Sequence, residues 1–340
     1  MAPKASASQY DESKIKTLSS LEHIRLRTGM YIGRLGTGNN PDDGIYVLLK
    51  EVVDNAVDEF IMGCGDRISV TLKDGSVSIR DRGRGIPLGK VIDCVSIINT
   101  GAKYSDDVFQ FSVGLNGVGT KAVNALSSRF RVVSYREGKY FEAVFERGIL
   151  KNKREGSAGR EPSGTLVEFT PDPEKFGEYA YNMEFVEKRM RHYAYLNSGL
   201  TLELNGQEFS STNGLLDLLK DETGDDVLYE AGYWRGDKIE FSFTHSNNYG
   251  EEYFSFVNGQ YTSDGGTHLS AFREGFLKAV NEFFQASYKG EDIREGLAAA
   301  VAIKLMNPMF ESQTKNKLGN GDIKPWIIQE VVRGVDDYLR

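Results

Sequence analysis

The chain has 340 residues, which is long enough for two domains that each bury a hydrophobic core. Hydrophobic residues at 40% and charged residues at 26% are ordinary for a globular protein, and the net charge of −8 argues against broad wrapping of nucleic acid. No apolar run approaches the roughly 20 residues of a membrane span, and the N-terminus has no signal-peptide core. Two cysteines exclude a disulfide framework, and four scattered histidines predict no transition-metal site. We therefore expect a cytoplasmic protein without a membrane partner.

The first two thirds of the sequence predict an arm followed by helices and antiparallel hairpins. Residues 1–14 are polar and rich in serine, which is typical of an arm. Asp74-Gly75 and Glu137-Gly138 stand between stretches that alternate apolar and polar residues, and they predict two hairpins. Residues 150–163 are rich in Gly, Lys and Arg and are expected to form a loop. Helices are expected at 19–28, 43–63, 183–197 and 214–220, and strands at 67–72, 76–80, 131–136, 139–146, 164–169 and 200–205.

An acidic stretch over residues 220–226 separates this region from a second one, and we place the domain boundary between residues 222 and 223. Beyond it, strands are expected at 228–234, 237–244, 251–258 and 297–305, and helices at 268–288 and 323–339. Strands that adjoin one another without regular βαβ alternation favour α+β sandwiches over a doubly wound sheet. The predicted fold class is therefore α+β in both domains.

The helix expected at 43–63 has a polar stripe whose side chains could take part in catalysis or ligand binding. The stripe consists of Glu51, Asn55, Asp58 and Glu59, opposite an apolar stripe of Leu49, Val53, Ala56 and Phe60. A solvated surface would explain the acidic residues. It does not explain Asn55, because an asparagine inside a helix competes for backbone hydrogen bonds. Glu51 and Asn55, one helical turn apart, are therefore candidates for a carboxylate that activates water and an amide that holds a cation.

Two glycine-containing segments complete the candidate site. The turn from Asp81 to Pro87 follows the first predicted hairpin and places one acid before glycines at a strand end. The segment 114–121 precedes an apolar helical stretch, so its backbone N–H groups and a helix start can approach phosphate oxygens. Its final Thr-Lys pair is in the wrong order for a P-loop, and no βαβ unit supports a dinucleotide fingerprint. Alone, this segment fits a plain turn equally well; together with the polar stripe it predicts a nucleotide hydrolysis site.

These segments resemble the four sequence boxes of the GHKL ATPases, which include type IIA topoisomerases, Hsp90 chaperones, MutL repair proteins and histidine kinases. The boxes are Glu51 with Asn55, Asp81 with Gly83 and Gly85, Gly114 to Gly119, and Gly164-Thr165. Residues 27–33, 264–268 and 313–315 further resemble the ATPase subunits of bacterial type II topoisomerases, which are gyrase B and the B subunit of topoisomerase IV. Tyr10-Asp11 is similar to the N-terminal arm of that family. The resemblance covers nearly the whole chain.

The resemblance implies an arm at 1–18, a GHKL α/β sandwich at 19–222 and a smaller transducer domain at 223–340. It also implies roles for the helix residues. Glu51 would be the general base that activates water, and Asn55 would coordinate Mg²⁺ on the phosphates.

The adenine contacts follow from the same resemblance. Asp81 would accept a hydrogen bond from the adenine amino group, and Thr165 would share a water with it. The pocket lining and its mouth would consist of Gly85, Ile86, Pro87, and Arg84 in an ion pair with Glu59.

The triphosphate contacts are also implied by the resemblance. Lys103 would close on the phosphates together with the glycine segment, which consists of Gly114, Leu115, Asn116, Gly117, Val118, Gly119, Thr120 and Lys121. Lys315, with Gln313, would reach the γ-phosphate from the second domain, so that ATP holds the two domains in one orientation. Tyr10 would reach into a partner protomer, so that ATP binding closes a homodimer.

The implied function is a Mg²⁺-dependent, ATP-operated dimer clamp that works with an A-type topoisomerase subunit on double-stranded DNA. Val47 stands where gyrase B proteins often carry a histidine, and Phe109 stands where a tyrosine is common. These departures favour the B subunit of topoisomerase IV over gyrase B. The sequence ends inside the last predicted helix, which indicates a fragment of a longer protein. Two alternatives stay open: another GHKL machine of the repair or chaperone type, and an ATP-sensing module that does not hydrolyse ATP.

Overall fold

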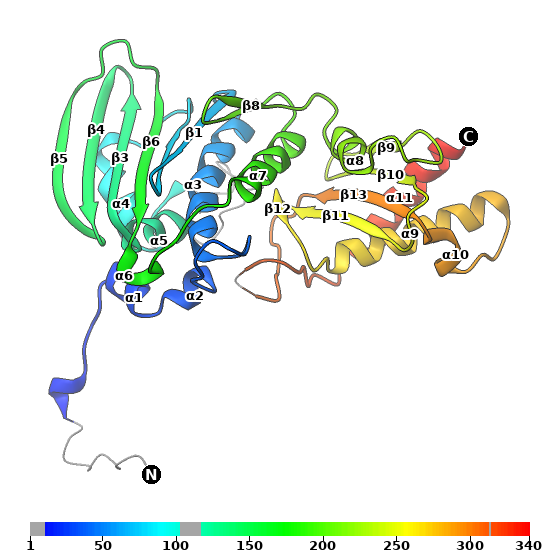
Figure 1. Cartoon of the computed structure of the whole chain (residues 1–340), viewed down its shortest axis with the longest axis horizontal. Coiled ribbons are helices and arrows are strands. Elements are labelled where there is room, and N and C mark those ends of the chain that lie inside the picture. Colours follow the sequence, from blue (N-terminus) through cyan, green and yellow to red (C-terminus); the bar gives the residue numbers. More distant parts are fainter. Residues whose placement is uncertain (1–10, 103–116, 313) are drawn as a thin grey trace.

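The computed structural model describes residues 11–102, 117–312 and 314–340. Two sheets, each packed with helices, follow one another along the long axis of the molecule (Figure 1). Strands join strands in hairpins and long excursions rather than in repeated βαβ units, and the predicted α+β class is confirmed. Within the described ranges, no helix is both long and apolar enough to cross a membrane.

The first sheet has eight strands in the order β5-β4-β3-β6-β2-β1-β7-β8. Neighbouring strands are antiparallel except β1 and β7, which run parallel. Both predicted hairpins are present, and their turn residues Asp74, Gly75, Glu137 and Gly138 have φ between 51° and 77°, as a type I′ turn requires. The strands are β1 (Arg67–Lys73), β2 (Ser76–Arg80), β3 (Ser127–Arg136), β4 (Lys139–Glu146), β5 (Ile149–Ser157), β6 (Gly164–Pro171), β7 (Thr201–Leu204) and β8 (Gln207–Phe209).

The loop predicted over residues 150–163 is wrong in its first half, because β5 is the outer edge strand of the first sheet. Arg154 of β5 lies opposite Glu142 of β4. Every residue of β5 is exposed, so the strand has no buried face that could impose an apolar alternation. Its lysine and arginine side chains also keep this edge from pairing with other strands.

Helices cover one face of the first sheet and bury its core with the inward residues of the strands. The central helix, α3, is buried on more sides than the sequence pattern predicts: Asp54 and Asp58 are each 1% exposed. The expectation that Asp58 lies on an open polar stripe is therefore wrong, because neighbouring elements pack around this part of α3. The helices of this half are α1 (Ser20–Leu26), α2 (Thr28–Ile32), α3 (Gly44–Ile61), α4 (Val91–Ser96), α5 (Gly119–Ala125), α6 (Pro173–Phe176) and α7 (Met183–Leu196), with short 3-10 turns at Glu12–Lys14 and Leu88–Lys90.

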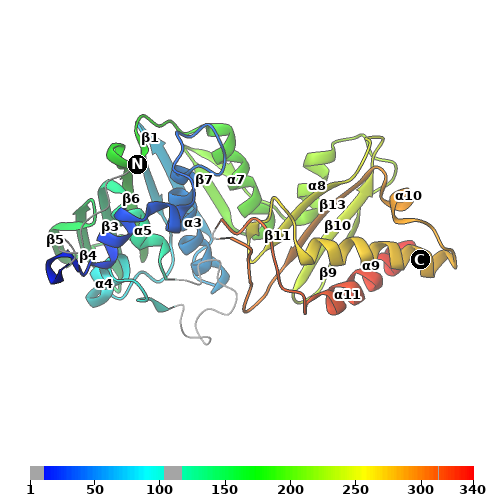
Figure 2. The same ribbon diagram turned by 90° about the horizontal axis from the view of Figure 1, so that it is seen from below.

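The second sheet has five strands in the order β12-β11-β13-β10-β9. Helices α9 and α11 cover one face of this sheet (Figure 2). There Phe272 and Phe276 of α9 make edge-on contacts with Phe241 and Phe243 of β10. Helix α8 packs against the other face through Leu215. The elements are α8 (Leu215–Thr223), β9 (Gly232–Arg235), β10 (Ile239–His245), β11 (Glu252–Val257), β12 (Gln260–Tyr261), α9 (Thr267–Phe284), α10 (Gly290–Arg294), β13 (Leu297–Ile303) and α11 (Lys324–Leu339).

Helix α7 connects the two halves of the molecule through consecutive residues. The hydroxyl of Tyr193 donates a hydrogen bond to Asp54 of α3. The ring of His192 lies edge-on to Phe256 of β11, with 5.2 Å between the ring centroids. Burial lowers the pKa of His192 to about 3, so this contact is made by a neutral ring at neutral pH. The boundary placed between residues 222 and 223 stays a prediction.

Candidate active site

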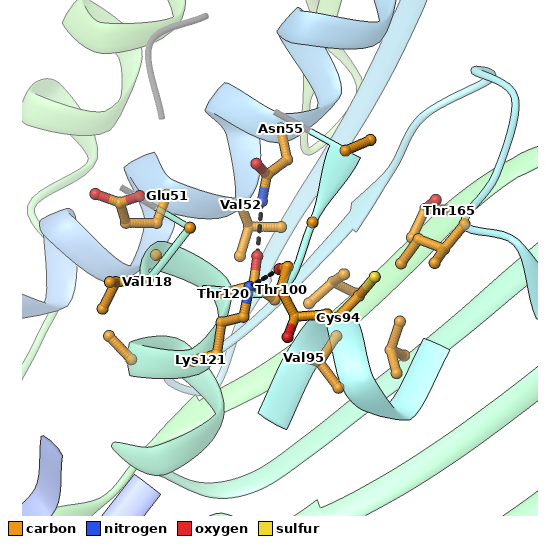
Figure 3. A pocket seen from close by; sticks show the side chains of 18 of the residues that line it. Glu51, Val52, Asn55, Cys94, Val95, Thr100, Val118, Thr120, Lys121 and Thr165 are labelled. Atoms are coloured by element: carbon orange, nitrogen blue, oxygen red, sulfur yellow. Dashed lines mark hydrogen bonds between the residues drawn. The ribbon is translucent and has the colours of Figure 1, made fainter. Parts of the chain in front are cut away.

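A cavity of about 370 Å³ lies beside α3, α4 and α5 and collects most of the predicted site residues (Figure 3). The predicted residues that line it are Glu51, Asn55, Glu59, Asp81, Arg84, Gly85, Ile86, Pro87, Gly117, Val118, Gly119, Thr120, Lys121, Thr165 and Lys315. The remaining predicted residues lie outside the described part of the chain: Tyr10, Lys103, Gly114, Leu115, Asn116 and Gln313.

Asp81 provides a buried acceptor in this cavity, directly after β2. Its Oδ1 accepts hydrogen bonds from the amides of Gly83 at 2.8 Å and Thr165 at 3.1 Å. Because both amides bond to Oδ1, Oδ2 remains to accept a hydrogen bond from a ligand. Burial raises the pKa of Asp81 to about 6 against the opposing effect of the two amides. Gly164 permits this arrangement, since a Cβ there would lie 2.2 Å from the Asp81 carbonyl oxygen.

Arg84 and Glu59 form a bidentate ion pair beside Asp81, as expected. The guanidinium donates to both carboxylate oxygens at 2.9 and 3.0 Å, and the Arg84 amide also donates to Glu59 at 2.9 Å. The turn backbone lies so close to the carboxylate that a Cβ on Gly83 would come within 2.6 Å of Glu59 Cγ. Arg136 donates to the Gly85 carbonyl at 3.0 Å, so two guanidinium groups flank the turn at the cavity.

Glu51 and Asn55 lie on α3 beside the first residues of α5. The Asn55 amide nitrogen donates to Thr120 Oγ1 at 2.7 Å, which fixes the orientation of the side-chain amide (Figure 3). A Cβ on Gly119 would lie only 2.0 Å from Glu51 Oε2. With Glu51 in this orientation, helix α5 can start against its carboxylate because residue 119 has no side chain.

Lys121 contributes to the cavity wall from a buried position. It is 4% exposed, and its ammonium group donates to the Thr100 carbonyl at 2.6 Å (Figure 3). This contact holds the chain at Thr100 against α5. The predicted phosphate ligand is thus also a structural anchor, a role that its position in the sequence does not indicate.

Lys315 reaches the cavity from the segment between β13 and α11. Its backbone is in the left-handed region with φ 59°, and its amide donates to the Ser312 carbonyl at 3.0 Å. The neighbouring Thr314 contacts the first half of the molecule, because a Cβ on Gly33 would lie 3.1 Å from Thr314 Cγ2. Lys315 therefore enters the cavity from a tight turn that touches the end of α2.

The segment that carries Lys315 is paired with the 264–268 motif. The Leu318 amide donates to the Gly265 carbonyl at 3.1 Å, and the Thr267 amide donates to the Leu318 carbonyl at 3.0 Å. Between them, Gly266 has φ 127°, and a Cβ there would lie 2.4 Å from the Leu318 carbonyl oxygen. The two motifs that appeared separately in the sequence are thus one structural unit.

Sequence reasoning missed twelve further wall residues of the cavity, which are Tyr31, Ile32, Val52, Ile79, Cys94, Val95, Thr100, Gly101, Ala102, Ala122, Val132 and Val167. The apolar residues alternate along strands as any core residues do, so the pattern does not distinguish a cavity wall from a packed interior. Tyr31 had an available signal, because it belongs to the 27–33 segment. Its hydroxyl lies 2.6 Å from Nδ1 of His23.

Asn55 is the described residue that best fits a Mg²⁺ ligand, since its amide nitrogen is used by Thr120 and its oxygen is a hard donor. Within the described ranges, no group of three or more His, Cys, Asp or Glu side chains gathers to hold a metal. Mg²⁺ in nucleotide sites commonly uses one or two protein oxygens together with the substrate phosphates. The residues therefore fit an ion carried by a nucleotide.

The site and fold together define the GHKL class of ATPase domain. The defining features are a Glu–Asn pair on one helix, a hydrogen-bond acceptor at a strand end and a helix start beside them, all within an α/β sandwich. The family model described as histidine kinase-, DNA gyrase B- and HSP90-like ATPase matches residues 40–175, and the model described as DNA gyrase B matches residues 210–340. The crystal structure of the 43K ATPase domain of Thermus thermophilus gyrase B is 33% identical with a TM-score of 0.72, covering 95% of this chain and 89% of that one. The chain belongs to the DNA gyrase B family of type II topoisomerase subunits, and the predicted family is confirmed.

Two curated relatives show how much of a full-length protein this chain covers. The B subunit of DNA topoisomerase 4 from Borreliella burgdorferi is 60% identical over 97% of this chain and 55% of that protein. The B subunit of DNA gyrase from Thermotoga maritima is 36% identical over 93% of this chain and 55% of that protein. The chain thus spans about half the length of the curated relatives it matches. The ATPase region of Saccharomyces cerevisiae topoisomerase II has the same fold, with 22% identity and a TM-score of 0.77 over 97% of this chain and 99% of that one.

Proposed function

We propose that this chain is the ATP-hydrolysing region of a bacterial type II DNA topoisomerase, with the B subunit of topoisomerase IV favoured over gyrase B. One observation carries the proposal: a single cavity brings together Glu51 and Asn55 of α3, Asp81, the start of α5, and Lys315 of the second half. The 60% identity to the B subunit of topoisomerase 4 from Borreliella burgdorferi supports the preference between the two enzymes.

The adenine ring lies beside Asp81. Its amino group donates to Asp81 Oδ2, whereas guanine presents a carbonyl at that position, so the site selects ATP over GTP. The amides of Gly83 and Thr165 hold the carboxylate in place through Oδ1. Side chains such as Ile79 and Val167 supply apolar walls for the ring.

The phosphates lie at the start of α5, where amides without partners in the helix and the helix dipole favour negative charge. Glu51, in contact with Gly119, orients the attacking water and accepts its proton. Asn55 would hold Mg²⁺ through its amide oxygen, and the bound ion would neutralise part of the phosphate charge. Lys315 donates a charge-assisted hydrogen bond to the γ-phosphate.

The γ-phosphate thereby ties the two halves of the molecule, because Lys315 belongs to the second half. Its release after hydrolysis frees the 19–222 domain from the 223–340 domain, and this change drives a clamp. In the proposed assembly, Tyr10 completes a homodimer on ATP binding, an A-type subunit joins it, and the complex passes double-stranded DNA in the cytoplasm.

Replacing Glu51 tests the proposal directly. We expect Glu51→Ala to bind a non-hydrolysable ATP analogue as the wild type does and to lose at least about a hundredfold in steady-state phosphate release. The control is Glu184→Ala, which removes an exposed acid in the first turn of α7, outside the cavity. Normal turnover by Glu51→Ala would refute Glu51 as the base, and a wild-type chain that binds ATP without hydrolysing it would favour the ATP-sensing alternative.

The choice between the two topoisomerases needs the full-length protein. Paired with each candidate A-type subunit, it should decatenate linked circles and relax supercoils rather than introduce negative supercoils. ATP-dependent negative supercoiling would identify gyrase instead. If the protein neither decatenates, relaxes nor supercoils DNA with either A-type subunit, another GHKL machine would be the better description.

A further inference from the structure

Helix α5 is short, and its two ends have different surroundings. It runs from Gly119 to Ala125, and its first residues contact Glu51 and Asn55 in the candidate site. A helix of seven residues has few internal hydrogen bonds and rises only about 10 Å, so contacts at its ends act together with the packing of its buried middle residues to set its position. The far end of α5 therefore influences the geometry at the near end.

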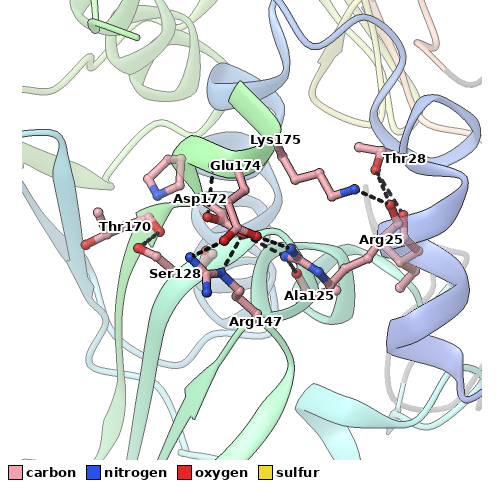
Figure 4. Close-up of polar contacts among 12 residues, drawn as sticks. Arg25, Thr28, Ala125, Ser128, Arg147, Thr170, Asp172, Glu174 and Lys175 are labelled. Carbon is pink, nitrogen blue, oxygen red and sulfur yellow. Dashed lines mark hydrogen bonds and ion pairs between the residues drawn. The ribbon is translucent and has the colours of Figure 1, made fainter. Parts of the chain in front are cut away.

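Arg25 of α1 holds that far end. Its Nη1 donates to the Ala125 carbonyl at 2.9 Å and lies 2.9 Å from Asp172 Oδ2 (Figure 4). The Asp172 amide donates to the Leu126 carbonyl at 2.9 Å. A cation at the last turn of a helix satisfies a carbonyl without a partner in the helix and complements the helix dipole. Arg25 and Asp172 together therefore fix the C-terminal end of α5.

Asp172 is a rigid anchor for this arginine. It is fully buried, and it also accepts hydrogen bonds from Arg147 Nε at 3.0 Å and from the Glu174 amide at 3.1 Å (Figure 4). Burial alone would raise the pKa of Asp172, but the Glu174 amide and the Arg147 and Arg25 guanidinium groups outweigh it and lower the pKa. The carboxylate is therefore ionised at neutral pH and keeps the Arg25 guanidinium in one orientation.

The backbone of α1 is fixed at the same place. The Arg25 carbonyl accepts hydrogen bonds from Lys175 Nζ at 2.8 Å and Thr28 Oγ1 at 3.1 Å (Figure 4). The turn between β4 and β5 closes the other side, since a Cβ on Gly148 would lie 3.1 Å from Leu21 and 3.5 Å from Ala125 Cα. Arg25 thus has a fixed backbone and a fixed charge partner from which to hold α5.

From this geometry we propose that Arg25 is a positioning residue for ATP turnover: by holding the C-terminal end of α5, it keeps Gly119 and Thr120 in register with Glu51 and Asn55. The inference rests on the proposed function and extends it to a residue that does not line the cavity. The adenine contact at Asp81 lies on β2 and its following turn, so it does not depend on α5. Loss of Arg25 therefore lowers the rate of hydrolysis and leaves adenine binding intact.

The test compares two arginines that share one carboxylate. Arg147 pairs with Asp172 and Glu174 as Arg25 does, whereas its side chain makes no contact with the α5 carbonyl. We expect Arg25→Ala to lower kcat about tenfold through a small displacement of α5, while Arg147→Ala lowers it less than twofold. The Kd for ADP, measured by calorimetry, should change no more than a few-fold in Arg25→Ala and less than twofold in Arg147→Ala, because the adenine contact at Asp81 is untouched and only the phosphate contacts at α5 shift.

Arg25→Lys is the conservative variant. It keeps the inference testable if Arg25→Ala fails to fold. A lysine keeps the positive charge at the end of α5, but its single ammonium group cannot reproduce the planar guanidinium fork, so kcat should recover in part. Equal losses of kcat in Arg25→Ala and Arg147→Ala, or a change confined to KM, would overturn the inference. A wild-type chain without ATP turnover would refute the proposed function instead, which keeps the two failures distinguishable.

Discussion

Glu51 on α3 and Gly119 on α5 are in direct contact: a Cβ on Gly119 would lie 2.0 Å from Glu51 Oε2. The candidate base and the helix start at which we propose phosphate binding therefore form one unit, and they come from segments far apart in the sequence. Any other residue at position 119 would force the Glu51 carboxylate or the start of α5 to shift. The relationship explains why a glycine is needed at a helix start where its φ is not positive.

Gly119→Ala should separate hydrolysis from binding. The added methyl group displaces either Glu51 or α5, so we expect kcat to fall about a hundredfold while the Kd for ADP changes only a few-fold. Phosphate release and calorimetry measure the two quantities. Gly89→Ala is the matched control, because a Cβ at Gly89 meets nothing within 4 Å. Wild-type turnover in Gly119→Ala would contradict the contact.

Nucleotide affinity should depend on pH through Asp81. Its pKa in the free protein is raised to about 6, mainly by burial. An adenine amino group needs the ionised carboxylate as its acceptor, so binding favours the deprotonated form. Affinity for ADP is then constant above about pH 7 and falls as the pH drops through about 6, by up to about tenfold per unit. Calorimetry from pH 5 to pH 8 measures this.

Asp81→Asn is the control for that titration, because the ADP phosphates also change protonation in this range. The variant should bind ADP weakly at every pH and should lack the protein part of the pH dependence. It should also be more stable than the wild type above pH 6, by up to about 3 kcal/mol, since the raised pKa means that ionised Asp81 opposes folding at high pH. The same slope of affinity against pH in both proteins would show that Asp81 does not contact the ligand.

Lys315 should affect turnover more than any other lysine of its segment. We expect Lys315→Ala to lower kcat about a hundredfold, the usual loss for one donor to a developing charge, while ADP, which lacks the γ-phosphate, binds as before. Lys317→Ala is the control, since Lys317 pairs with Glu311 at 3.1 Å and does not line the cavity. Tighter binding of ADP than of a triphosphate analogue by the wild type would argue against a γ-phosphate contact.

Asp54 should contribute to the stability of the helix that carries Glu51 and Asn55. Its buried carboxylate pairs with Lys50 and accepts a hydrogen bond from the buried Tyr193 hydroxyl of α7. Asp54→Ala leaves a poorly solvated ammonium group and a hydroxyl without their acceptor, and it should cost about 3 kcal/mol of unfolding free energy. Tyr193→Phe should cost about 1 kcal/mol. Denaturant unfolding measures both, and a loss below about 0.5 kcal/mol for Asp54→Ala, the level of surface substitutions, would contradict this role.

The sequence by itself determined the local elements and the family. Turn residues such as Asp74-Gly75 require a particular backbone, and alternation beside them predicts strands, because both signals depend on neighbouring residues only. The glutamate–asparagine spacing and the glycine segments could be recognised as family motifs because they too depend on neighbouring residues only. An edge strand such as β5, exposed along its whole length, carries no such signal, and its pairing with β4 became visible only in the sheet.

Only the tertiary structure decided which side chains work together. Lys315 enters the cavity because Gly266 lets its segment pair with the 264–268 motif, and Lys121 is buried against Thr100. Arg25 meets Ala125 a hundred residues away. The raised pKa of Asp81 is likewise a property of burial, which no single segment contains. Packing brings distant segments together and removes water from between them, and both effects arise only when the helices and sheets are assembled.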